Sequence, residues 1–130
     1  MAGKKKIQVM ENIYDENERI ADKINVNIMG SPGAGKTTSI IHLIRHFKKY
    51  TPFVIEGDIE SDLDTQTLNK LGVKTVQINT GGACHLDAPL VENAVPQLGA
   101  DKKGILFIEN IGNLVCPAEF VIGEHIKVLV

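Results

Sequence analysis

The sequence reads Gly30-Ser31-Pro32-Gly33-Ala34-Gly35-Lys36-Thr37-Thr38 directly after a short β-branched apolar run and directly before a stretch with helical apolar spacing. Residues 30–37 match the pattern G-x-x-x-x-G-K-[ST] at every fixed position. This pattern forms a phosphate-binding loop when a strand precedes it and a helix follows it. Because both flanking stretches fit, the sequence predicts a P-loop and not a chance glycine-rich turn.

Each part of this loop has a predicted role, and we expect all residues from 30 to 38 to contact a nucleotide. The glycines allow successive backbone N–H groups to point at phosphate oxygens, and the helix amino terminus adds a partial positive charge. Lys36 is predicted to reach the β- and γ-phosphates, and Thr37 to place its hydroxyl on Mg²⁺.

Outward from the loop, short apolar runs alternate with longer helical patterns. This alternation favours βαβ crossovers and a mainly parallel sheet covered by helices. The predicted strands are 25–29, 52–56, 73–79, 105–109 and 126–130, and the predicted helices are 36–50, 61–71 and 87–98. We therefore predict an α/β fold of the P-loop NTPase type over residues 25–130, preceded by an amphipathic helix over residues 1–24.

The composition excludes several classes of protein. The 130 residues are 43% hydrophobic and 23% charged, which argues against disorder. The net charge of −2 provides no basic surface for nucleic acid, and no apolar run approaches the roughly 20 residues of a membrane span. Two cysteines are too few for a disulfide framework, so we expect a cytoplasmic protein.

Acidic residues follow two of the predicted strands, where a nucleotide hydrolase needs groups that hold the metal. Glu109 ends the strand 105–109, and Gly112 is placed to offer its N–H to the γ-phosphate. Asp58 follows the strand 52–56 within an acidic stretch whose later members are equally typical of a solvated loop. We predict Lys36, Asp58 and Glu109 as catalytic residues, and Thr37, Asp58 and Glu109 as the magnesium site.

Cysteine and histidine follow two further strands. Cys84 and His85 lie in a glycine-rich segment after the strand 73–79, and Cys116 follows the strand 105–109. Carboxyl ends of parallel strands share one sheet edge with the P-loop, so these three side chains can converge near the nucleotide. Thiolate and imidazole suit Zn²⁺ or Ni²⁺. The alternative is two structural cysteines and an unrelated histidine.

Four segments resemble a known family when they are read together. In this order and with these separations, GSPGAGKTT, EGD, GGACHLDA and ENIGNLVCPAEF resemble the nickel-incorporation GTPases of hydrogenase maturation, the HypB family, which belong to the SIMIBI class. The resemblance extends from about residue 10 to residue 130. The related urease-accessory nickel GTPases match less well, because this chain lacks their Cys-Pro-His arrangement.

The resemblance implies a GTPase with a low intrinsic rate that binds GTP and Mg²⁺ and forms a homodimer when GTP is bound. The residues matching Cys84, His85 and Cys116 form a Ni²⁺ or Zn²⁺ site at the dimer interface of that family. The implied partners are the hydrogenase large subunit, into which nickel is inserted, and a nickel-binding accessory protein. Neither nucleic acid nor a membrane is an expected partner.

One departure leaves alternatives open. The sequence contains no N-K-x-D element, which reads guanine in such proteins, so GTP preference rests on the resemblance and we predict a fold incomplete at the carboxyl end. A P-loop ATPase or small kinase with structural cysteines is one alternative. A metal-storage or dimerisation module that binds nucleotide without turnover is another.

Overall fold

The computed structural model describes residues 23–47, 49–57, 62–99, 104–113 and 115–130, without the side chains of residues 62–64. The predicted amino-terminal helix lies outside the described residues except for its last two positions, which belong to a strand. Asp58 also lies outside them. The remaining predicted site residues are all described.

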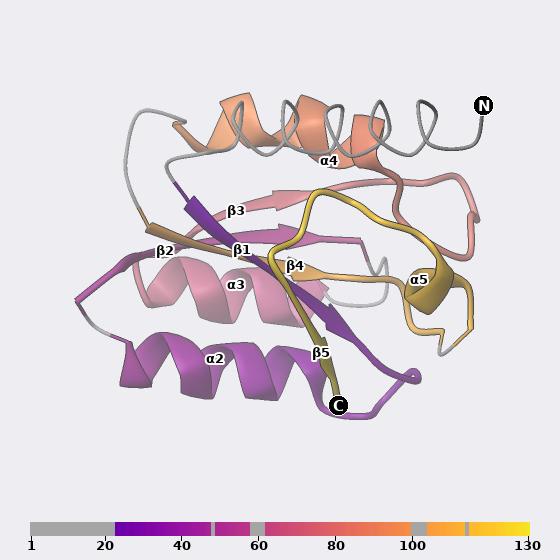
Figure 1. Ribbon diagram of the computed structural model, residues 1–130. Helices are drawn as coiled ribbons and strands as arrows, with labels where there is room; N and C mark the ends of the chain where they lie inside the picture. Colours follow the sequence, from indigo (N-terminus) through magenta and orange to yellow (C-terminus); the bar gives the residue numbers. More distant parts are fainter. Residues whose placement is uncertain (1–22, 48, 58–61, 100–103, 114) are drawn as a thin grey trace.

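Five parallel strands form one sheet in the order β3-β2-β4-β1-β5. Their bounds are β1 Lys23–Met29, β2 Thr51–Glu56, β3 Lys74–Gln77, β4 Gly104–Glu109 and β5 Ile126–Leu129. Because all strands run in the same direction, their carboxyl ends meet at one edge, on the right of Figure 1. The loops at that edge carry the predicted site residues.

Helices cover both faces of the sheet (Figure 1). Helices α2 (Lys36–His46) and α3 (Asp62–Lys70) lie on one face. Helix α4 (Ala88–Ala94) and the 3₁₀-helix η1 (Val95–Leu98) lie on the other. A single short turn of helix, α5 (Cys116–Glu119), lies at the carboxyl edge of the sheet. The α/β fold predicted from the sequence, a parallel sheet covered by helices, is confirmed.

Alternating side chains of the inner strands build two hydrophobic cores. Leu106 and Ile108 of β4 belong to the core under α4 and η1, whereas Ile105 and Phe107 belong to the core under α2 and α3. Successive side chains of a strand point to opposite faces, so a strand buried on both faces is apolar throughout. All six residues of β4 are buried. The two cores fix the sheet, and with it the positions of the loops at its carboxyl edge.

Several predicted boundaries differ from the structure. Helix α2 ends at His46 instead of residue 50, because Phe47 leaves the helical region with ψ at 53°. The predicted helix 87–98 changes to 3₁₀ geometry near Pro96, which has no N–H for an α-helical bond. Strand β3 is four residues long, shorter than predicted. Helix α5 is absent from the prediction because one turn gives no periodic signal.

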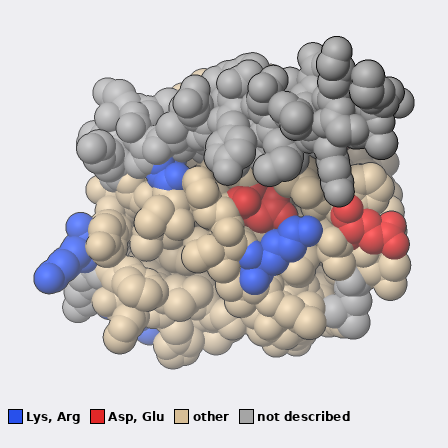
Figure 2. Space-filling view, in the orientation of Figure 1, with Lys and Arg blue, Asp and Glu red and all other residues tan. Residues whose placement is uncertain are grey.

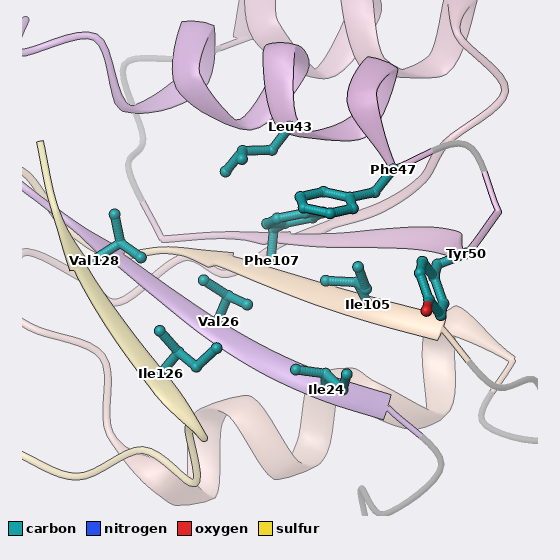
Figure 3. Close-up of a pocket in the computed structure, with 9 residues that line it drawn as sticks. All are labelled: Ile24, Val26, Leu43, Phe47, Tyr50, Ile105, Phe107, Ile126 and Val128. Carbon is teal, nitrogen blue, oxygen red and sulfur yellow. The ribbon is translucent and has the colours of Figure 1, made fainter.

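An apolar pocket of about 360 Å³ lies between the second half of α2 and strands β1, β4 and β5 (Figure 3). Its lining residues are Ile24, Val26, Leu43, Phe47, Tyr50, Ile105, Phe107, Ile126 and Val128. None of them is a predicted site residue. The pocket is therefore separate from the P-loop, which leads into the opposite end of α2.

The charged side chains are scattered over the part of the surface that Figure 2 displays. Among its described residues, that face has no continuous patch of Lys and Arg. No helix in the described part of the chain has the length and apolar character needed to cross a bilayer.

Candidate functional site

The phosphate loop connects β1 to α2 and has backbone geometry that needs glycine. Gly33 and Gly35 have φ values of 75° and 99°, in the left-handed region that side chains disfavour. Lys36 is 4% exposed, and its ammonium donates hydrogen bonds to the carbonyls of Gly30 at 3.2 Å and Ser31 at 3.1 Å. The loop therefore wraps around a buried positive charge, which is the group that a phosphate would contact.

Thr37 meets a carboxylate from the neighbouring strand. Its hydroxyl lies 2.7 Å from Oε1 and 2.8 Å from Oε2 of Glu109, which ends β4 and is 3% exposed. Strands β1 and β4 are paired, which brings the two residues together across 72 positions of sequence. A hydroxyl and a carboxylate supply the hard oxygen atoms that Mg²⁺ prefers, so this pair fits a magnesium ion.

Gly112 packs directly against the phosphate loop. A Cβ atom on Gly112 would lie 2.9 Å from Cγ and 3.1 Å from Cα of Pro32, which is too close for a side chain. A backbone bridge between Gly30 and Asn113 joins the same two segments. The segment after β4 therefore rests on the loop, as needed for a group that senses the terminal phosphate.

Cys84, His85 and Cys116 converge as predicted. Their candidate ligand atoms all lie within 4.8 Å of one another, and Sγ of Cys84 is 3.4 Å from Nδ1 of His85. The loop between β3 and α4 supplies the first two residues, and the start of α5 supplies the third. The three side chains are exposed or half-buried, so a metal ion has access to them. Two sulfur ligands and one nitrogen ligand suit Zn²⁺ or Ni²⁺.

Neighbouring side chains hold these candidate ligands in place. The imidazole of His85 stacks on the ring of Phe120, with centroids 4.0 Å apart and planes 3° from parallel. Oδ1 of Asn113 accepts hydrogen bonds from the backbone N–H of Val115 at 2.8 Å and of Cys116 at 3.4 Å. The stack orients the imidazole, and the Asn113 cap fixes the backbone at the cysteine.

The Cys116 thiol has a pKa above its ordinary value. The hydrogen bond with the Cys84 side chain is the main cause, followed by burial and by negative charge at Cys84 and Glu119. Asn113 acts weakly in the opposite direction. The thiol is therefore protonated at neutral pH until a cation replaces the proton.

Sequence reasoning assigned no role to Asn110, which the structure places between the two sites. Its side chain is completely buried, and Oδ1 accepts from the N–H of Leu86 at 3.1 Å and of Ile111 at 2.9 Å. Its Nδ2 donates to Oδ1 of Asn27 at 3.1 Å. The sequence signal for Asn110 was a polar amide directly after the predicted strand 105–109, which is apolar up to Glu109, because a buried amide needs hydrogen-bond partners.

Comparisons with known proteins agree on one family. Residues 24–128 match the model of the CobW/HypB/UreG nucleotide-binding domain. The hydrogenase maturation factor HypB of Escherichia coli K12 is 40% identical over 141 residues, covering 100% of this chain and 49% of the relative. The chain thus spans about half the length of that curated relative.

Two solved structures have a similar fold. The crystal structure of HypB from Archaeoglobus fulgidus has a TM-score of 0.80 and 32% identity, covering 100% of this chain and 62% of the other. The crystal structure of HypB from Helicobacter pylori in complex with nickel has a TM-score of 0.76 and 37% identity, covering 97% and 59%.

Proposed function

Because this chain belongs to the CobW/HypB/UreG nucleotide-binding family, we propose that it is the nucleotide- and metal-binding part of a HypB-type GTPase. In this proposal the protein binds and hydrolyses GTP with Mg²⁺, carries nickel, and inserts it into the hydrogenase large subunit in the cytoplasm. A nickel-binding accessory protein supplies or shares the metal. The relatives named as hydrogenase maturation factors, and the nickel complex of one of them, support this assignment.

The observation that carries the proposal is the position of the Cys84, His85 and Cys116 cluster at the same sheet edge as the phosphate loop. A P-loop alone fits an ATPase, a kinase or a GTPase equally well. Two cysteines alone fit a structural role. Their side chains instead converge with a histidine at the sheet edge that carries Lys36 and Thr37. This combination favours a nucleotide hydrolase that controls a soft metal ion.

Each site residue has a separate role in the proposed hydrolysis. Lys36 neutralises charge on the β- and γ-phosphates, and backbone N–H groups of the loop, to which Pro32 contributes none, surround the remaining oxygens. Thr37 and Glu109 hold Mg²⁺, and Asp58 is proposed to join them. Gly112 donates its N–H to the γ-phosphate, and its contact with Pro32 supports this role. Magnesium supplies charge stabilisation on the transferred phosphoryl group.

Nickel is the cargo in this proposal, and the homodimer completes its site. Zinc in closed sites takes four ligands, whereas the cluster in the described part of the chain offers three. The second copy of the chain in the homodimer supplies the remaining ligands. Hydrolysis releases the γ-phosphate contact at Gly112, only four positions before Cys116, and thereby loosens the metal site.

Nickel affinity and nucleotide competition test the proposal in the intact protein. GTP should displace a fluorescent guanine nucleotide analogue better than ATP does. The Ni²⁺ dissociation constant should differ between the states with GDP and with a non-hydrolysable GTP analogue, by roughly 5- to 150-fold for a typical coupling. Equal displacement by ATP contradicts the GTPase assignment, and equal Ni²⁺ affinity in the two states contradicts the metal switch.

We predict that Ni²⁺ affinity rises with pH. Metal ions bind the thiolate, and the raised pKa of Cys116 keeps its proton in place at neutral pH, so nickel must displace that proton. Affinity should increase by up to about tenfold per pH unit for each proton released, between about pH 6 and pH 9. Titration against a competing chelator measures the slope, and Cys116→Ala should reduce it. A flat profile contradicts this prediction.

A further inference from the structure

Asn110 makes a buried connection between the two sites. On one side its Oδ1 accepts from the N–H of Ile111, the residue directly before Gly112. On the other side the same oxygen accepts from the N–H of Leu86, the residue directly after His85. One side-chain oxygen therefore fixes both the segment that rests on the phosphate loop and the segment that carries two candidate metal ligands.

The orientation of this amide is set by its neighbours. Two backbone N–H groups require an oxygen at the Oδ1 position, so Nδ2 must face Asn27 of β1, whose Oδ1 accepts from it at 3.1 Å. The backbone N–H of Asn110 also donates to the Ile28 carbonyl at 3.0 Å. Asn110 is thus tied to the strand that leads into the phosphate loop.

Packing makes the loop that carries His85 respond to movement at Leu86. The Leu86 side chain is completely buried in the core under α4. A Cβ atom on Gly57 would lie 2.8 Å from three carbon atoms of Leu86, so there is no space for that side chain to shift toward β2. The N–H of Gly57 in turn donates to the Glu109 carbonyl at 2.8 Å. A displacement of the segment after β4 therefore moves Leu86 and the adjacent His85 together.

We infer that Asn110 is the positioning residue that couples γ-phosphate contact at Gly112 to the geometry of the metal ligand His85. The inference rests on the proposed function, because it assumes that nucleotide and nickel binding are linked. Asn110 itself touches neither ligand. When Ile111 and Gly112 shift with the nucleotide, the shared oxygen shifts the Leu86 N–H and so changes the distance between His85 and Cys116.

The test is the ratio of Ni²⁺ dissociation constants with GDP and with a non-hydrolysable GTP analogue. In the intact protein, thiolate-to-nickel absorbance gives both constants. Asn110→Leu should bring the ratio close to one. Asn110→Asp should keep the ratio close to its wild-type value. Its carboxylate oxygens still accept from the N–H groups of Leu86 and Ile111, and the Asn27 amide can rotate so that its Nδ2 donates to the carboxylate. Asn69→Leu is the matched control, since Asn69 is exposed near the carboxyl end of α3, where its Oδ1 accepts a hydrogen bond from the hydroxyl of half-buried Thr75 at 3.1 Å.

A purely structural role for Asn110 predicts a different result. General loosening of the fold weakens nickel binding in both nucleotide states and leaves the ratio unchanged, which overturns the inference. Linkage gives a second readout, because nickel must change the affinity for the GTP analogue by the same factor.

If Asn110→Leu does not fold, Asn27→Val replaces it and should reduce the ratio at least threefold. A ratio of one in the wild-type protein overturns the proposed function and this inference together, whereas a ratio retained in the variants overturns only the inference.

Discussion

Lys36→Ala should lower single-turnover GTP hydrolysis by roughly 100- to 1000-fold, the typical cost of removing one preorganised charge-stabilising donor. The Lys36 ammonium is buried inside the loop and held by the Gly30 and Ser31 carbonyls, so its charge is already in position. Alanine leaves the developing charge on the γ-phosphate without its main cation. Rapid-quench measurement of phosphate release, with enzyme in excess over GTP, gives the rate of the chemical step.

Lys70→Ala is the matched control, because Lys70 is an exposed lysine at the end of α3, away from the loop. Its hydrolysis rate should stay within about twofold of the wild-type rate, as expected for a surface substitution. Thermal unfolding of both variants separates lost chemistry from lost structure. A Lys36→Ala rate within a few-fold of the wild-type rate contradicts the assignment of Lys36. If Lys36→Ala is unfolded and Lys70→Ala is folded, the lost activity reflects lost structure and not lost chemistry.

The position of the candidate site at the carboxyl edge of the sheet was predictable, because the P-loop motif and the common direction of parallel strands both indicate it. The P-loop pattern fixes a strand before Gly30 and a helix after Lys36, and the structure has both. Parallel strands place all their carboxyl ends at one edge, and the rule brings Cys84, His85 and Cys116 together without any knowledge of strand order. The pairing of Thr37 with Glu109 follows from the same rule.

The connections between the sites were not predictable, because they depend on distant partners. Asn110 pairs with Asn27 across 83 positions and with Leu86 across 24, and no local pattern indicates either contact. The stack of His85 on Phe120 requires α5, a turn too short to give a helical period. Helix ends also depend on context, as Phe47 shows by ending α2 early. Sequence patterns therefore locate the ligands, and tertiary packing determines how they are linked.

Cys84→Ala and Cys116→Ala should each weaken Ni²⁺ binding by more than about 100-fold, since loss of a residue that merely orients a ligand already costs 10- to 100-fold. Each thiol is one of three ligand groups within 4.8 Å of one another, so the variant protein keeps one sulfur and one imidazole. A two-ligand site of this kind holds nickel weakly. Mass measurement under native conditions, with Ni²⁺ and a GTP analogue, should show a metal-bound dimer for the wild-type protein and a metal-free species for each variant.

The exposed imidazole of His42 provides the control for general loss of metal-binding side chains. His42 lies on α2, outside the cluster of three ligands, and His42→Ala should keep the metal-bound dimer. Because Cys84 is exposed and Cys116 is half-buried, alanine at either position should leave the thermal midpoint nearly unchanged without metal. Added Ni²⁺ should then raise the midpoint of the wild-type and His42→Ala proteins only, because a ligand stabilises the state that binds it. A metal-bound dimer that survives both cysteine substitutions contradicts the site, and nickel must then bind elsewhere.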